Sequence, residues 1–234
     1  MDKIKFLVDL QGYDSLIDET QNTLLEIQNK IDDNSLEVEA SSIHIAISER
    51  LASLATTRMN LERDVANLTE RRHAVNDRIY GGNIQNEKEF LALQEEIGSL
   101  GDKIASIENS LLEAMVEHER YEEGFAKAKE NLRQVQSARK AGLIILIRQK
   151  EDNVSLLSKK LPLREEARAR CDAMSLHSYD RLRKSKGGIA IARMQSDLCS
   201  ACRVAVPSQM IQQLRKGTEL VFCNSCQRIL CLMD

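Results

Sequence analysis

Four of the six cysteines form two Cys-x-x-Cys pairs near the end of the sequence. Cys199 and Cys202 make the first pair, Cys223 and Cys226 make the second, and twenty residues separate the two. Each pair can present two thiolates from one tight turn, and two such turns supply the tetrahedral four-sulfur environment that Zn²⁺ accepts. The spacing therefore predicts one structural Zn²⁺ bound by these four residues.

A site with four protein ligands has no coordination position left for water, so the predicted zinc is structural rather than hydrolytic. The four histidines are scattered, and the sequence shows neither a Gly-rich phosphate loop nor a nucleophile with an evident base. We therefore expect no enzymatic activity and no catalytic residue. The remaining cysteines, Cys171 and Cys231, are interpreted as small apolar packing residues.

The residues around the cysteine pairs predict a small β domain. Residues 219–222 and 229–233 are mostly apolar and predict two short strands, while residues 207–215 predict a loop or a single helical turn. Gly187 and Gly188 predict a hinge before this segment. We expect a C4 zinc ribbon over residues 187–234, whose folding depends on the metal because its own core is small.

The rest of the chain has the composition of long helices that bury one apolar stripe. Charged residues make up 29% and aromatic residues only 3% of the sequence, and Trp is absent. Apolar residues recur with alternating steps of three and four over residues 6–31, 47–79 and 90–135. A Gly81-Gly82 turn separates the second run from the third, so these two runs should fold back on each other.

The predicted fold class is therefore mostly α: a long antiparallel coiled-coil hairpin over residues 1–186 with a small C-terminal β zinc ribbon. The tip lies near 81–83, and paired residues should have numbers that sum to about 169, which places Val65 opposite Ile104. Interruptions of the apolar spacing predict a bend near 32–35 and 139–143. Pro162 is expected to kink or interrupt the helix, with a last helical segment from about 163 to 184.

The charge is divided unevenly along the chain. Residues 1–180 hold 24 basic and 33 acidic residues, whereas residues 181–234 hold 9 basic and 3 acidic residues. The basic segment could contact nucleic-acid phosphates, bind an acidic protein, or simply keep the surface solvated. The candidate partner-binding residues are Arg181, Arg183, Lys184, Lys186, Arg203, Arg215, Lys216 and Arg228.

The cellular location of the protein is predicted from the lack of a membrane span and of a secretory signal. No apolar run approaches the roughly 18 residues that a membrane span needs, and the first residues lack the apolar block of a secretory signal. We therefore expect a cytoplasmic protein without a membrane span.

The whole arrangement resembles a bacterial family of coiled-coil proteins that end in a C4-type zinc ribbon. The resemblance covers nearly the whole chain and is carried by Lys88 to Ile97, Tyr179 to Arg183, Gly188 to Ala190, the two cysteine pairs, and Cys226 to Leu230. The sequence departs from the family pattern at Asn224 and Gln227, where Pro and Gly are usual, and at Cys231, where an aromatic residue is usual.

This resemblance implies a non-enzymatic adaptor. Family members in flagellated bacteria act as chaperones for the sigma-N type of sigma factor and can bind flagellin message. Relatives in chlamydiae are linked to that sigma factor and to type III secretion components. The implied partner is therefore a sigma-N factor or a secretion or flagellar component, and the alternative is a protein that binds RNA or DNA through its basic segment.

Overall fold

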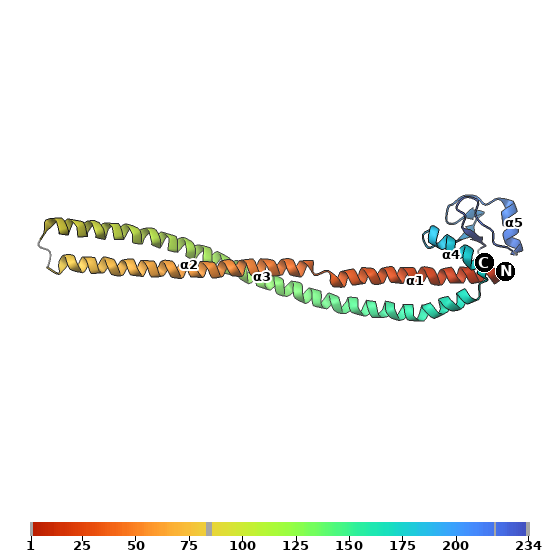
Figure 1. Cartoon of the computed structure of the whole chain (residues 1–234), viewed down its shortest axis with the longest axis horizontal. Helices are drawn as coiled ribbons and strands as arrows, with labels where there is room; N and C mark the ends of the chain where they lie inside the picture. Colours follow the sequence, from red (N-terminus) through yellow and green to blue (C-terminus); the bar gives the residue numbers. More distant parts are fainter. Residues whose placement is uncertain (1, 83–85, 218, 233–234) are drawn as a thin grey trace. The chain divides into compact units, whose positions relative to one another are not determined.

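The computed structural model describes residues 2–82, 86–217 and 219–232 (Figure 1). The chain forms, in order, α1 (Asp2–Asp32), α2 (Ser35–Tyr80), α3 (Glu87–Ala169), α4 (Ala173–Ser185), β1 (Ile191–Gln195), β2 (Leu198–Cys199), α5 (Ser208–Lys216) and β3 (Ile229–Cys231). These elements confirm the predicted fold class. They make two compact units: a hairpin unit, residues 34–141, and a ribbon unit, the described residues up to 33 and from 142 onward.

In the hairpin unit, α2 and the first half of α3 lie side by side and run in opposite directions (Figure 1). At the end of α2, the Gly81 N–H donates to the Asp77 carbonyl at 2.8 Å, and Gly82 has a φ of +79° that favours glycine. Asn83, the last residue of the predicted tip, lies outside the described residues. Val75, Leu93 and Leu100 form the buried core nearest the tip.

Contacts between the two helices confirm the predicted register. The His44 and Phe125 rings lie 4.9 Å apart between centroids, and their residue numbers sum to the predicted value. Three ion pairs connect residues whose numbers sum to two less: Arg50 with Glu117, Arg71 with Glu96, and Arg78 with Glu89. The heptad spacing therefore aligned the helices from His44 to the tip, whereas Glu37 pairs with Arg139, a pair whose numbers sum to more than predicted.

In the ribbon unit, α1 packs against the second half of α3 and against α4 (Figure 1). Its buried stripe includes Leu10, Ile17 and Ile27 from the predicted heptad run. Leu7 is also completely buried, although it lies beside that run rather than in it. The reason is that α1 has a second neighbour near its beginning, the zinc ribbon.

The predicted interruption of the helix at Pro162 is wrong, because α3 continues through this residue to Ala169. The helix is bonded to α1 on both sides of the proline, by Lys150 to Gln28 and by Arg164 to Asp14. The chain breaks instead at residues 170–172. There Asp172 caps α4 by accepting the Ser175 N–H at 3.0 Å, which fixes the start of the new helix.

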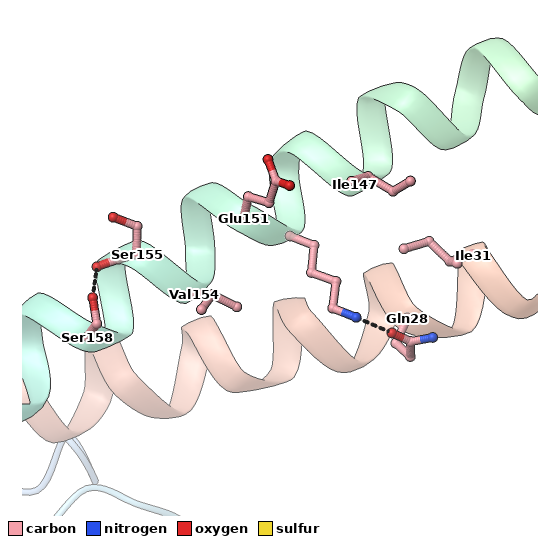
Figure 2. A pocket seen from close by; sticks show the side chains of 8 residues that line it. Gln28, Ile31, Ile147, Glu151, Val154, Ser155 and Ser158 are labelled. Atoms are coloured by element: carbon pink, nitrogen blue, oxygen red, sulfur yellow. Dashed lines mark hydrogen bonds between the residues drawn. The ribbon is translucent and has the colours of Figure 1, made fainter.

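Part of the second half of α3 borders an open groove (Figure 2). The groove has a volume of about 590 Å³, and its walls include Ile147 and Val154 of α3 and Ile31 of α1. The Lys150 ammonium donates to the Gln28 side-chain oxygen at 2.7 Å across it. Because these long polar side chains lie between the helices, Ile147 and Val154 remain about half exposed.

The ribbon contains a three-stranded sheet with the order β2-β1-β3. Strand β1 pairs antiparallel with β2 and parallel with β3, with Ile191 opposite Ile229. Residues 191–195 had not been predicted as a strand. The predicted strand at 219–222 is reduced to one bridge, between Phe222 and Ile229, and the predicted turn at 207–215 is the nine-residue helix α5.

Alternate residues of β1 and β3 face two different cores. Ile191, Ile229 and Cys231 belong to a cluster with Leu7 and Leu10 of α1. The intervening residues, Ala192 and Leu230, belong to a second cluster that includes cysteines of both pairs. Since side chains of a strand alternate between its two faces, the sheet separates a core on the α1 side from a core on the cysteine side.

None of the helices formed by the described residues combines the length and apolar character that crossing a membrane requires.

Candidate metal centre

The two cysteine pairs lie in turns with the same backbone hydrogen bonds. In the first turn the Cys199 N–H donates to the Val204 carbonyl and the Arg203 N–H donates back to the Cys199 carbonyl, at 3.0 and 2.7 Å. In the second turn Cys223 bonds in the same way with Arg228 and Gln227, both at 2.9 Å. The fourth residue after each leading cysteine is left-handed, with φ of 58° at Arg203 and 63° at Gln227.

The two turns bring four sulfur atoms together. All four Sγ atoms lie within 4.8 Å of one another. The Sγ atoms of Cys199 and Cys226 are 3.8 Å apart, and those of Cys202 and Cys223 are 3.7 Å apart. A tetrahedral zinc with bonds of about 2.3 Å has sulfur atoms about 3.8 Å apart. The cluster therefore fits one Zn²⁺, and its donors are the four predicted cysteines.

The protein environment treats the four thiols unequally. Burial raises the pKa of the Cys199 thiol to about 12. A hydrogen bond from the Val204 backbone lowers the pKa of the Cys202 thiol to about 7. Because the thiolate is the form that binds metal, zinc binding at neutral pH displaces protons, and the affinity of the cluster should fall as the pH decreases.

The eight candidate partner-binding residues differ in how far their side chains are exposed. Five of them have exposed side chains: Arg181, Lys184, Arg203, Arg215 and Lys216. Arg215 and Lys216 lie in the last turn of α5, where positive charge also suits the helix dipole. These five residues are available for a partner.

The other three are partly buried and at least two of them have internal partners. Arg183 makes ion pairs with Asp18 and, at 3.5 Å, with Asp14. The Arg228 guanidinium donates to the carbonyls of Ile189 and Lys186, at 2.8 and 3.0 Å. Arg183 therefore joins α4 to α1, and Arg228 joins the ribbon to the segment after α4, so changing either would alter the fold as well as the surface charge.

The predicted hinge at Gly187 and Gly188 is a bonded turn. Both glycines have positive φ, and the Gly188 N–H donates to the Arg183 carbonyl at 2.9 Å. The side chain of Gln11 then accepts the N–H groups of Ala190 and Ile191, at 2.8 and 2.6 Å. The ribbon is thus attached to α1 directly after the turn, rather than through an open linker.

A buried polar cluster, which the sequence had not indicated, supports this attachment. Asp14 is 2% exposed and accepts hydrogen bonds from the Arg164 side chain at 2.8 Å and the Tyr179 hydroxyl at 2.7 Å. The cluster therefore joins α1, α3 and α4. In the sequence, the only sign of this cluster was an acidic residue, Asp14, next to the apolar stripe of α1.

Two family models match the sequence. A model described as a CT398-like coiled coil hairpin domain matches residues 10–187, and one described as a C4-type zinc ribbon domain matches residues 198–230. Among curated proteins, none matches the chain.

Several solved structures share the fold. The structure of CT398 from Chlamydia trachomatis has a TM-score of 0.81 at 20% identity and covers 99% of this chain and 98% of its own. The HP0958 protein from Helicobacter pylori has a TM-score of 0.56 at 13% identity, covering 98% and 97%. A structure from Mycobacterium smegmatis has a TM-score of 0.55 at 19% identity and covers 95% of this chain and 98% of its own.

The C4-type ribbon model and the clustered sulfurs together identify a zinc-binding site.

Proposed function

Because the chain belongs to the family of CT398-like coiled-coil hairpin proteins, we propose that it is a non-enzymatic adaptor that binds a protein partner. The partner would be a sigma-N factor or a component of a type III secretion or flagellar apparatus, as the resemblance of the sequence implies. The protein would act in the cytoplasm as a chaperone-like regulator, with its zinc in a structural role.

The observation that carries this proposal is an exposed basic surface on a ribbon that is fixed to α1. Gln11 and the core around Leu7 and Leu10 hold the ribbon, so the exposed side chains of Arg203, Arg215 and Lys216 have a defined setting. An array of positive charges with a fixed geometry favours a partner with a complementary acidic surface.

The decisive experiment measures binding of the purified sigma-N factor of the same organism to the full chain by titration calorimetry. Reversing Arg215 and Lys216 to Glu should weaken binding, because both side chains are exposed and carry positive charge at the surface of the ribbon. The matched control reverses Lys127 and Lys129, which are exposed in the hairpin unit. Zinc content and helical circular dichroism should be the same in both variants. Equal binding by the two variants would remove the ribbon surface from the proposal.

The second candidate function is binding of RNA or DNA by the same basic surface. Pull-downs with and without nuclease distinguish the two, because a protein partner survives nuclease treatment and a nucleic-acid bridge does not. For an RNA ligand, the logarithm of the affinity should fall linearly with the logarithm of the salt concentration. Loss of all partners after nuclease, together with that salt dependence, would favour the nucleic-acid function.

A further inference from the structure

The two flanks of the hairpin unit differ in chemistry. We assign heptad position a to Leu51, Val65 and Ile104, which lie in the seam between α2 and α3. Three of the ion pairs between the helices then join g positions and lie on one flank: Arg50 with Glu117, Arg71 with Glu96, and Arg78 with Glu89. That flank is closed by charge pairs within the chain. A fourth pair, Glu37 with Arg139, lies at the far end of the unit and joins a positions.

The opposite flank carries uncharged residues where solvent-facing charges are usual. Its b positions over four heptads of α2 and two of α3 are Ile45, Ala52, Met59, Ala66, Ala105 and Leu112. Met59 and Leu112 are 62% and 60% exposed, and the register given by the ion pairs brings both to this flank at neighbouring levels. A second heptad stripe therefore runs along the unit without a helix over it in the described part of the chain.

The rim of this stripe is acidic. The e and f positions on its two sides, together with the next b position of α3, carry six carboxylates: Glu49, Glu62, Glu108, Glu119, Glu122 and Glu123. Arg63 is the one basic residue in the same set of positions. A second copy of the chain would bring one acidic rim against another, which opposes self-association. A helix with basic flanks would complement the rim.

We propose that this flank of the hairpin unit, the Met59–Leu112 flank, binds an amphipathic helix of a partner protein, with apolar residues toward Met59 and Leu112 and Lys or Arg at its edges. Recognition of this kind places apolar residues of the helix, spaced by three, four and seven, into an apolar stripe. The distance from Ile45 to Met59 corresponds to about 21 Å of helix, so a partner helix of roughly 15–20 residues is long enough. The inference rests on the proposed adaptor function and gives it a second surface, opposite in charge to the ribbon.

The test uses a fluorescent synthetic helix of about 20 residues with Leu at its seam positions and Lys at its flanks. Its binding to the full chain is measured by anisotropy, and the same helix with Glu in place of Lys serves as a comparison. The variant M59E/L112E changes the flank. The control variant N60E/S106E adds the same two charges at exposed c positions on the other side.

The Lys helix should bind the wild type and N60E/S106E alike, and M59E/L112E at least about tenfold more weakly. The Glu helix should bind none of them. Both variants gain two negative charges, so simple charge attraction would strengthen binding to both, and a loss in M59E/L112E alone reports the apolar flank.

Equal binding of the Lys helix to both variants would overturn the proposal. So would a wild-type dimer, seen by sedimentation, that M59E/L112E converts to a monomer, because the flank would then belong to a second copy. The proposed adaptor function is tested by a different result, since a sigma-N factor that does not bind the full chain would contradict it. The experiment with the Lys helix tests only whether the Met59–Leu112 flank binds a helix.

Discussion

Gln11 of α1 completes the hydrogen bonding of Ile191 at the start of β1. The Gln11 side-chain oxygen accepts the Ile191 N–H at 2.6 Å, and the Gln11 side-chain nitrogen donates to the Ile191 carbonyl at 3.1 Å. A neighbouring strand would satisfy the same two groups. At Ile191, β3 pairs with one edge of β1, while β2 pairs with the other edge only at Met194 and Gln195. The side chain of Gln11 therefore takes the place of a neighbouring strand at Ile191.

Replacing Gln11 by Leu should loosen the ribbon from α1. The change removes the partners of the Ala190 and Ile191 N–H groups and of the Ile191 carbonyl, and unpaired buried groups cost about 1–3 kcal/mol each. Faster amide exchange at Ala190 and Ile191 would show the effect. Gln21→Leu, an exposed change in the same helix, should leave both amides unchanged. Full protection of Ile191 in Gln11→Leu would contradict the assigned role.

Tyr179 should make the ribbon unit sensitive to alkaline pH. Burial, followed by the hydrogen bond to Asp14, raises the pKa of the Tyr179 hydroxyl well above its ordinary value of 10. A raised folded-state pKa contributes stability that is complete below pH 10 and is lost as the pH rises further. The unfolding free energy should therefore fall more steeply above about pH 10 in the wild type than in Tyr179→Phe.

At neutral pH, Tyr179→Phe should itself be less stable by about 1–3 kcal/mol, because Asp14 loses a donor. Tyr80→Phe, at a residue that is 81% exposed, is the control and should match the wild type at every pH. Parallel pH profiles for the wild type and Tyr179→Phe would mean that this hydroxyl does not govern the alkaline loss.

Removing zinc should affect α1 as well as the ribbon. Ile229 and Cys231 pack on Leu7 and Leu10, while Leu230 between them packs on the cysteine side. Loss of the metal should therefore expose both faces of β3 and speed amide exchange in the first turns of α1. Chelation followed by hydrogen exchange and mass spectrometry measures this, with peptides from residues 34–141 as the internal reference.

The ligand assignment has its own matched pair of variants. Cys202→Ser should abolish binding of the expected one Zn²⁺ per chain while most of the helical circular dichroism remains, because the ribbon contributes few helical residues. Cys171→Ser, a change outside the sulfur cluster, should retain the metal. Metal retention by Cys202→Ser would remove this residue from the ligand set.

Gln227→Gly should stabilise the ribbon. Gln227 has a φ of 63°, and a left-handed conformation costs a residue with a Cβ about 1–2 kcal/mol, partly offset by the larger entropy loss of Gly on folding. We expect a net gain of about 0.5–1 kcal/mol, visible as tighter zinc retention against a competing chelator. Ser225→Gly changes the same turn at a residue without positive φ and should bring no gain.

The spacing of residues was enough to predict the coiled coil and the metal site. Heptad spacing and the Gly81-Gly82 turn fixed the pairing of α2 with α3, because each apolar stripe needs a partner and the nearest one follows the turn. Two Cys-x-x-Cys pairs predicted the sulfur cluster, because each pair forms its turn locally. In both cases short-range pattern determined the structure.

The attachment of the ribbon could not be predicted in the same way. Gln11 and Ile191, or Asp14 and Tyr179, are more than 160 residues apart, and a single polar residue carries no signal about a distant partner. Pro162 was misjudged for a related reason: contacts with α1 on both sides keep α3 helical despite the local cost of proline. Tertiary contacts decided these points.

The bonded turn at Gly187 and Gly188 has a consequence for the energetics of recognition. A ribbon on an open linker would lose orientational freedom when its surface was captured, and that loss would oppose binding. Here the Gly188 N–H, the Gln11 side chain and the Arg228 guanidinium restrict that freedom before any partner arrives. The entropy of orienting the basic surface is lost when the chain folds, so an encounter with a partner meets a surface that is already preorganised.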